Sequence, residues 1–219
     1  MKAVIFDMDG VLFDTERLCM ESWCVLAREQ GIADMEIVFP KCIGRNAADT
    51  QVIVSDYYGK SFDYESFRRQ ASDWFWQYIK DNGLPIKKGV REILTYLNKA
   101  GYAVGLASST RYSSVVNHLE EAGIKDDFSV IVTGDMVKHS KPQPDIYLLA
   151  CERLGVEPQE AYAIEDSYNG IRSAHAAGMK PVMVPDLLEP DEEMRSLSFL
   201  ICKDLTEVLS YFKGDERLQ

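Results

Sequence analysis

Two aspartates, Asp7 and Asp9, stand directly after an apolar run in the segment KAVIFDMDG at residues 2–10. The run is mostly β-branched or apolar, which is typical of a buried strand. Neighbouring carboxylates repel each other and burial raises that cost, so such a pair requires a counter-ion or a chemical task. Asp7 can attack phosphorus to form an aspartyl-phosphate, and Asp9 can protonate the leaving oxygen and then activate water. These two residues therefore predict phosphoryl transfer.

Polar residues also follow three other apolar runs that predict strands. The segment ASST supplies Ser108, Ser109 and Thr110, the segment HSKPQP supplies Lys141, and AYAIED ends in Glu165 and Asp166. Each group alone has a simpler explanation as a turn residue, a helix cap or a solvated lysine. The carboxyl ends of parallel strands meet at one edge of a sheet, however. Four strand ends that carry acid, hydroxyl, amine and acid favour a single functional site.

The three acidic residues at these strand ends, Asp7, Glu165 and Asp166, predict a bound cation. Ligands that are all oxygen favour a hard divalent ion, Mg²⁺ rather than zinc. Ser108 and Lys141, together with backbone amides at helix starts, could bind the remaining phosphate oxygens. Phosphoryl transfer needs mainly alignment and charge neutralisation, which this set of groups supplies.

The elements that carry these residues alternate between strand and helix after residue 85. One helix between each two strands implies right-handed crossovers and a parallel sheet covered on both faces. The fold class that we expect is α/β, a doubly wound, Rossmann-like parallel sheet. The predicted strands cover 102–108, 128–134, 161–166 and 180–185, and the predicted helices cover 89–101, 111–123, 141–155, 167–178 and a last one near 205–212.

Residues 15–84 depart from this alternation. They contain three helical patterns in succession, at 15–31, 46–59 and 64–83, with no strand between them. This block is far longer than one crossover needs, so we interpret it as an inserted all-helical cap. The expected domains are a catalytic core formed by 1–14 and 85–219 and a cap formed by 15–84.

Composition excludes several classes of partner. The 219-residue chain has a formal net charge of −11, which argues against nucleic acid or an anionic membrane as partner. No apolar stretch approaches the roughly 20 residues of a membrane span, and the acidic start MKAVIFDMDG does not fit a signal peptide. Five cysteines without CxxC spacing are typical of reduced thiols. We expect a cytoplasmic monomer.

Other phosphate-handling or metal-binding motifs do not fit. The chain has no GxxxxGK[ST] loop and no GxSxG turn. An EF-hand loop counted from Asp7 would need glycine where Leu12 stands. A receiver domain carries its acidic pair and its phosphorylated aspartate on different strands and has no helical cap. It therefore fits this sequence less well than a capped phosphoryl-transfer enzyme does.

Four segments, DMDGVLFDT, LASST, KPQPDIY and IEDSYNGIRSAHAAGM, resemble the four motifs of the haloacid dehalogenase superfamily in that order. A cap placed directly after the first motif is similar to the β-phosphoglucomutase-like branch. The resemblance implies that Asp7 is the nucleophile and Asp9 the general acid and base. It also implies that Ser108, Ser109 and Lys141 bind the phosphoryl group. The second aspartate, Asp9, argues against a true dehalogenase.

The same resemblance implies a ligand set for Mg²⁺. The ion would be held by Asp7, the backbone carbonyl of Asp9 and Asp166, with Glu165 close by through water. The substrate would be a small phosphorylated metabolite, a sugar or polyol phosphate, and the reaction its hydrolysis. A sugar phosphomutase is the alternative. A non-catalytic binding protein is a third reading, which the acid and base residue Asp9 argues against because binding alone does not need it.

Four residues of the cap or near it are candidates for substrate contact. Arg45, in IGRNAADT, resembles a cap arginine that contacts a distal anionic group, although a surface arginine at a helix end would look the same. Arg111, just beyond ASST, could also face substrate. In β-phosphoglucomutase a histidine follows the DT dipeptide by four residues, but counting from Thr15 that position holds Cys19. This departure favours a phosphatase over a mutase.

Overall fold

The computed structural model of the protein describes residues 2–43 and 47–214. The chain divides into two compact units, one formed by Met1–Phe13 with Ile86–Gln219 and the other by Asp14–Pro85. No helix among the described residues is long and apolar enough to cross a membrane.

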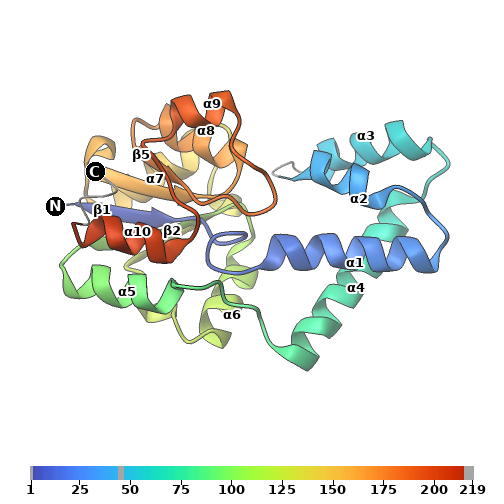
Figure 1. Cartoon of the computed structure of the whole chain (residues 1–219), viewed down its shortest axis with the longest axis horizontal. Coiled ribbons are helices and arrows are strands. Elements are labelled where there is room, and N and C mark those ends of the chain that lie inside the picture. The colour runs from blue at the N-terminus through green and yellow to red at the C-terminus, as the bar shows by residue number, and fades with distance from the viewer. Residues whose placement is uncertain (1, 44–46, 215–219) are drawn as a thin grey trace. The chain divides into compact units, whose positions relative to one another are not determined.

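The first unit is built on one parallel sheet with the strand order β3-β2-β1-β4-β5-β6 (Figure 1). Strand β1 pairs with β2 on one side and β4 on the other, and its last residue, Phe6, lies level with Leu106 and Ile164. The strands that follow β1 in the sequence are first added on one side of it, as β2 and β3, and then on the other side, from β4 onward. Ligands of parallel sheets bind at such a switch point. The expected α/β fold is confirmed. The strands are β1 (Ala3–Phe6), β2 (Ala103–Ser108), β3 (Val130–Thr133), β4 (Ala161–Glu165), β5 (Lys180–Met183) and β6 (Leu200–Ile201).

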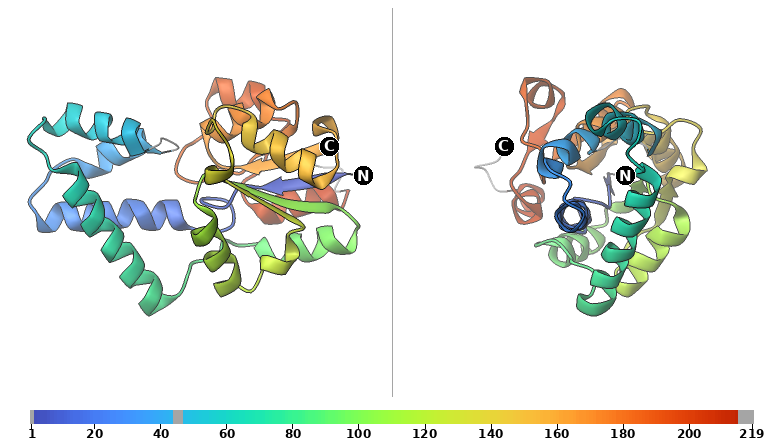
Figure 2. Two further views of the ribbon diagram at one scale, coloured as in Figure 1. Left: turned by 180° about the vertical axis from the view of Figure 1, so that it is seen from behind. Right: turned by 90° about the vertical axis from the view of Figure 1, so that its right-hand side faces the viewer.

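Helices cover both faces of this sheet, as the view from behind in Figure 2 also shows. Helix α7 packs on β1, β2 and β3, and α8 packs on β4 and β5; α5 packs on β2 and on α10. The helices are α5 (Val90–Lys99), α6 (Tyr112–Glu121), α7 (Asp145–Leu154), α8 (Tyr168–Ala176), α9 (Glu192–Leu197) and α10 (Leu205–Phe212), with 3-10 turns at Lys125–Asp127, Gly134–Met136 and Pro158–Glu160.

Small side chains on the strands make room for α7. Ala3 and Ile5 of β1 join a buried cluster with Ile146 and Tyr147 of α7. Because successive strand residues point to opposite faces, this set comes from alternate positions of β1. Ala3 and the other alanines of this cluster have small side chains and so leave space for Tyr147. Tyr147 is the bulkiest of the fully buried side chains that the structure describes.

Helix α9 and strand β6 are additions to the elements that the sequence predicts. The carboxylate of Asp191 accepts a hydrogen bond from the Met194 amide and so caps α9. Strand β6 has only two residues and pairs with β5, where Val182 lies level with Leu200. A six-residue helix and a two-residue strand are too short to produce a periodic pattern, so the sequence does not reveal them.

All elements of the second unit among its described residues are helices, which are joined by short loops. Trp23 of α1 lies at its centre and makes edge-to-face contacts with Phe39, Tyr64 and Phe67, at centroid distances of 5.2, 6.1 and 5.5 Å. Its two ends meet because the Asp14 amide donates to the Pro85 carbonyl at 2.9 Å. The helices are α1 (Thr15–Glu29), α2 (Met35–Val38), α3 (Ala47–Tyr58) and α4 (Tyr64–Asn82), with a 3-10 turn at Phe39–Cys42.

We expect Trp23→Ala to lower the free energy of unfolding by about 3–5 kcal/mol, because it leaves a large cavity among aromatic rings. Trp76→Ala is the matched control: Trp76 is 46% exposed and Trp23 only 6%, so its loss should stay below about 1 kcal/mol. Urea titration followed by circular dichroism measures both. Equal losses in the two variants would contradict the assignment of Trp23 as the centre of this unit.

Candidate active site

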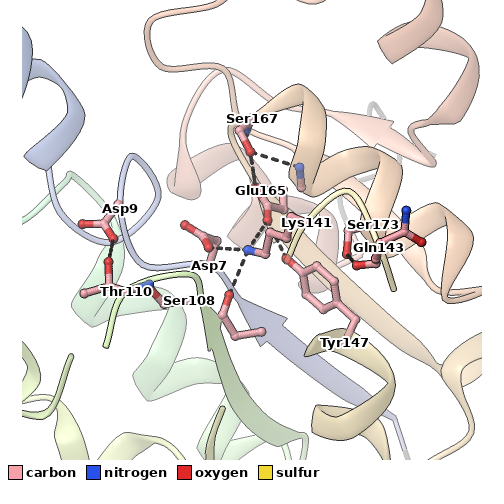
Figure 3. Close-up of polar contacts among 12 residues, drawn as sticks. Asp7, Asp9, Ser108, Thr110, Lys141, Gln143, Tyr147, Glu165, Ser167 and Ser173 are labelled. Carbon is pink, nitrogen blue, oxygen red and sulfur yellow. Dashed lines mark hydrogen bonds and ion pairs between the residues drawn. The ribbon is translucent and has the colours of Figure 1, made fainter. Parts of the chain in front are cut away.

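Lys141 joins three strand ends of the sheet at one point (Figure 3). Its Nζ lies 2.5 Å from Asp7 Oδ1 and 2.6 Å from Glu165 Oε1, and it donates to the Ala107 carbonyl at 3.0 Å. Asp7 follows β1, Glu165 ends β4 and Ala107 lies in β2. The three protons of the ammonium group therefore each have an acceptor, which holds a flexible side chain in one position.

The charges at this point are buried, and their pKa values respond to one another. Burial raises the pKa of Asp7 well above its usual value, and although Lys141 opposes this shift, the Glu165 charge reinforces it. Burial alone would lower the pKa of Lys141, but the carboxylates of Asp7 and Glu165 outweigh it and raise this pKa. The ammonium group consequently stays protonated, and positive charge close to Asp7 favours the ionised form of its carboxyl group.

A third carboxylate lies in the same cluster. One oxygen each from Asp7, Glu165 and Asp166 all lie within 4.8 Å of one another, and the three residues are buried. A single ammonium group cannot balance three carboxylates in a low-dielectric site, so the cluster retains negative charge. Oxygen ligands with excess negative charge suit a hard divalent cation. The residues present therefore fit a metal ion of that class.

Gly10 allows the chain to pass close to this cluster. Its φ is +80°, a left-handed conformation that favours glycine. A Cβ atom at this position would lie 2.2 Å from Asp166 Oδ2. The glycine after the two aspartates is therefore required both by the backbone turn and by the position of the Asp166 carboxylate.

Glu165 is enclosed on all sides. Its Oε1 accepts from Lys141 and from the hydroxyl of Tyr147, the latter at 2.7 Å. Its Oε2 accepts from Ser167 through the backbone amide at 3.4 Å and the hydroxyl at 3.2 Å. Both oxygens of the carboxylate therefore accept hydrogen bonds, which hold the group in one orientation.

Asp9 has a different partner, Thr110. The Thr110 hydroxyl donates to Asp9 Oδ2 at 2.8 Å, and the Thr110 amide donates to Ser108 Oγ at 3.1 Å. Ser108 is fully buried, so its hydroxyl is fixed at the end of β2. The alternative role of this segment as a cap of α6 is not what the structure shows, since the Tyr112 amide donates to Asp135 instead.

The structure describes four of the five remaining predicted site residues. Ser109 is exposed, and its carbonyl lies against the backbone of Gly134. Arg111 is exposed at the start of α6. In the second unit, Thr15 is buried and Cys19 half-buried, both on α1, whereas Arg45 lies outside the described residues.

Sequence reasoning missed two contact residues, Tyr147 and Ser167. Tyr147 occupies an inward position of α7 and looks like a core aromatic, which it also is. The available signal was its hydroxyl, because a tyrosine that is buried needs a hydrogen-bond partner. Ser167 was expected only as the start of a helix, and it does cap α8 by accepting from the Gly170 amide.

Comparison with known proteins identifies the family. The family model described as haloacid dehalogenase-like hydrolase matches residues 4–184. The phosphorylated carbohydrates phosphatase of Thermotoga maritima is 33% identical, covering 83% of this chain and 84% of its own. The β-phosphoglucomutase of Bacillus subtilis is 32% identical over the whole of both chains. The crystal structure of β-phosphoglucomutase from Clostridium difficile superposes with a TM-score of 0.76 at 25% identity, covering 97% of this chain and 96% of that one. The resemblance read from the four motifs is thus confirmed, and the chain belongs to the haloacid dehalogenase-like hydrolases.

Proposed function

We propose that this protein is a Mg²⁺-dependent phosphatase of small phosphorylated metabolites, with sugar or polyol phosphates as substrates. The observation that carries the proposal is the buried cluster in which Lys141 bridges Asp7 and Glu165 beside Asp166. The substrate class is supported by the similarity to a phosphatase of phosphorylated carbohydrates.

The metal would be held by Asp7, Asp166 and the backbone carbonyl of Asp9. Glu165 contributes its charge, and the resemblance implies that its contact with the ion passes through water, since its oxygens already lie against Lys141, Tyr147 and Ser167. When bound, Mg²⁺ neutralises charge on the phosphoryl oxygens and favours the ionised form of the carboxylates around it.

In the first step, an oxygen of Asp7 attacks phosphorus while the bond between phosphorus and the ester oxygen breaks. Lys141 holds Asp7 in place and supplies positive charge at the site. The phosphoryl oxygens are bound by Ser108 and Ser109. Asp9 gives its proton to the leaving oxygen, so the alcohol departs neutral. The product on the protein is an aspartyl-phosphate.

In the second step, Asp9 is ionised and takes a proton from water, which attacks phosphorus and releases phosphate from Asp7. The hydroxyl of Thr110 donates to Asp9, which holds the Asp9 carboxyl group in place for this step. Each residue thus returns to its starting state after one cycle.

Water is favoured over a sugar hydroxyl as the final acceptor. Cys19 stands at the position where the resemblance to β-phosphoglucomutase calls for a histidine. Thr15, Cys19, Arg45 and Arg111 remain the candidates for contact with the rest of the substrate.

The first test is phosphate release from a panel of sugar and polyol phosphates, with Mg²⁺ and with EDTA. We expect release only with Mg²⁺, because without the cation the carboxylates repel a phosphate ester. Asp7→Asn removes the nucleophile at nearly constant shape and should lower kcat by about 10³-fold or more. Turnover at the wild-type rate in this variant would refute the assignment of Asp7. Phosphorus NMR on the same samples would instead indicate a mutase if phosphate moves between sugar carbons and none is released.

The role of Asp9 predicts a separation between binding and turnover. Asp9→Asn cannot donate or accept the proton, so kcat should fall by about 10²–10⁴-fold. The inhibition constant of inorganic phosphate should change little, because the groups that bind it are retained. Steady-state kinetics with and without added phosphate measures both quantities, and an unchanged kcat would exclude the proton-transfer role.

Gly10→Ala tests the metal assignment through Asp166. The new Cβ atom would displace the Asp166 carboxylate, so the Mg²⁺ concentration for half-maximal activity should rise by about 10–100-fold. Gly31→Ala is the control, because Gly31 also has a positive φ, +68°, but nothing lies within 4 Å of its Cβ position. Both variants bear the strain of the left-handed backbone, so an equal Mg²⁺ requirement in the two would argue against Asp166 as a ligand.

A further inference from the structure

We infer that Tyr147 is a positioning residue: its hydroxyl fixes Glu165, and Glu165 in turn fixes the ammonium group of Lys141 beside Asp7. The inference deepens the proposed function and rests on it, because it requires Lys141 to act at the phosphoryl group on Asp7.

Core packing alone does not explain why residue 147 carries a hydroxyl group. The ring is fully buried in a cluster rich in alanine, where phenylalanine would fill the same space. A hydroxyl taken out of water needs a partner or destabilises the fold. Its partner is Glu165 Oε1, at 2.7 Å.

Glu165 is held in a tight socket that Tyr147 completes. Ser167 binds Oε2, which leaves Oε1 for Lys141 and Tyr147. On the remaining side lies Gly170, where a Cβ atom would come within 1.9 Å of the Glu165 carboxyl carbon. The carboxylate therefore has one orientation, and removing the Tyr147 hydroxyl is the smallest change that loosens it.

Lys141 depends on that orientation. Its four-carbon side chain is flexible, and its position is set by the three acceptors Asp7, Glu165 and Ala107. Tyr147 contacts Lys141 a second time, since Nζ lies 5.0 Å from the centre of the tyrosine ring. Tyr147→Phe keeps the ring contact and deletes only the hydroxyl, so it isolates the effect that passes through Glu165.

The test compares Tyr147→Phe with Tyr162→Phe. Tyr162 is a matched control because it is also buried and lies on β4 with Glu165, but near the opposite end of the strand. On the best substrate of the panel, kcat/KM should fall by about tenfold in Tyr147→Phe and stay within about twofold of wild type in Tyr162→Phe. Calorimetric titration with inorganic phosphate in the presence of Mg²⁺ should show a lower phosphate affinity in Tyr147→Phe and an affinity close to that of wild type in Tyr162→Phe.

A double-mutant cycle separates positioning from a purely structural role. In the Lys141→Ala background, Tyr147→Phe should cause no further loss of kcat/KM, because the group that it positions is absent. Additive losses would overturn the inference. If Lys141→Ala does not fold, the inference is tested by the phosphate affinities of Tyr147→Phe and Tyr162→Phe. Equal affinities in these two variants would also overturn the inference.

The two proposals fail in different ways. If the wild-type protein releases no phosphate from any substrate, the proposed function is wrong, and the comparison of phosphate affinities still tests Tyr147. If the wild-type protein is active and Tyr147→Phe matches both wild type and Tyr162→Phe in kcat/KM and in phosphate affinity, the positioning role is wrong while the phosphatase stands. Lower thermal stability of Tyr147→Phe with unchanged kcat/KM would likewise assign the hydroxyl to folding alone.

Discussion

The ammonium group of Lys141 between the carboxylates of Asp7 and Glu165 is the interaction on which the rest of the site depends. Buried charges are tolerated only when they are paired and hydrogen-bonded, and this group meets both conditions with three acceptors. Without it, two buried carboxylates would face each other uncompensated. The same contacts join the ends of β1, β2 and β4, so the charge arrangement and the sheet support each other.

The sheet makes this arrangement possible because β1 has a neighbour on each side. The Asp7 amide donates to the Ile164 carbonyl at 2.9 Å, which keeps Asp7 level with Glu165. Small side chains on the strands admit the bulky Tyr147 from α7, and its hydroxyl then reaches Glu165. The ring of Tyr147 thus packs in the core of the sheet, while its hydroxyl binds a carboxylate of the site.

Charge explains why the proposed reaction needs a metal ion. The chain carries a formal net charge of −11 and the cluster holds three buried carboxylates, so the field at the site repels a phosphate ester. Lys141 is already engaged with Asp7 and Glu165 and cannot by itself balance the third carboxylate and a phosphate group. In the proposed reaction, a divalent cation would supply positive charge where phosphoryl transfer needs it.

Local patterns of residues predict the α/β alternation, the succession of helices that interrupts it, and the positions of Asp7, Ser108 and Glu165 at strand ends and of Lys141 in the segment between β3 and α7. These follow from local periodicity and from the rule that parallel strands share one edge. Which of these groups touch one another depends on the tertiary structure. The bond from Thr110 to Asp9 joins residues 101 positions apart, and that from Tyr147 to Glu165 joins residues 18 apart. Such contacts depend on strand order and helix packing, which no local pattern of residues encodes.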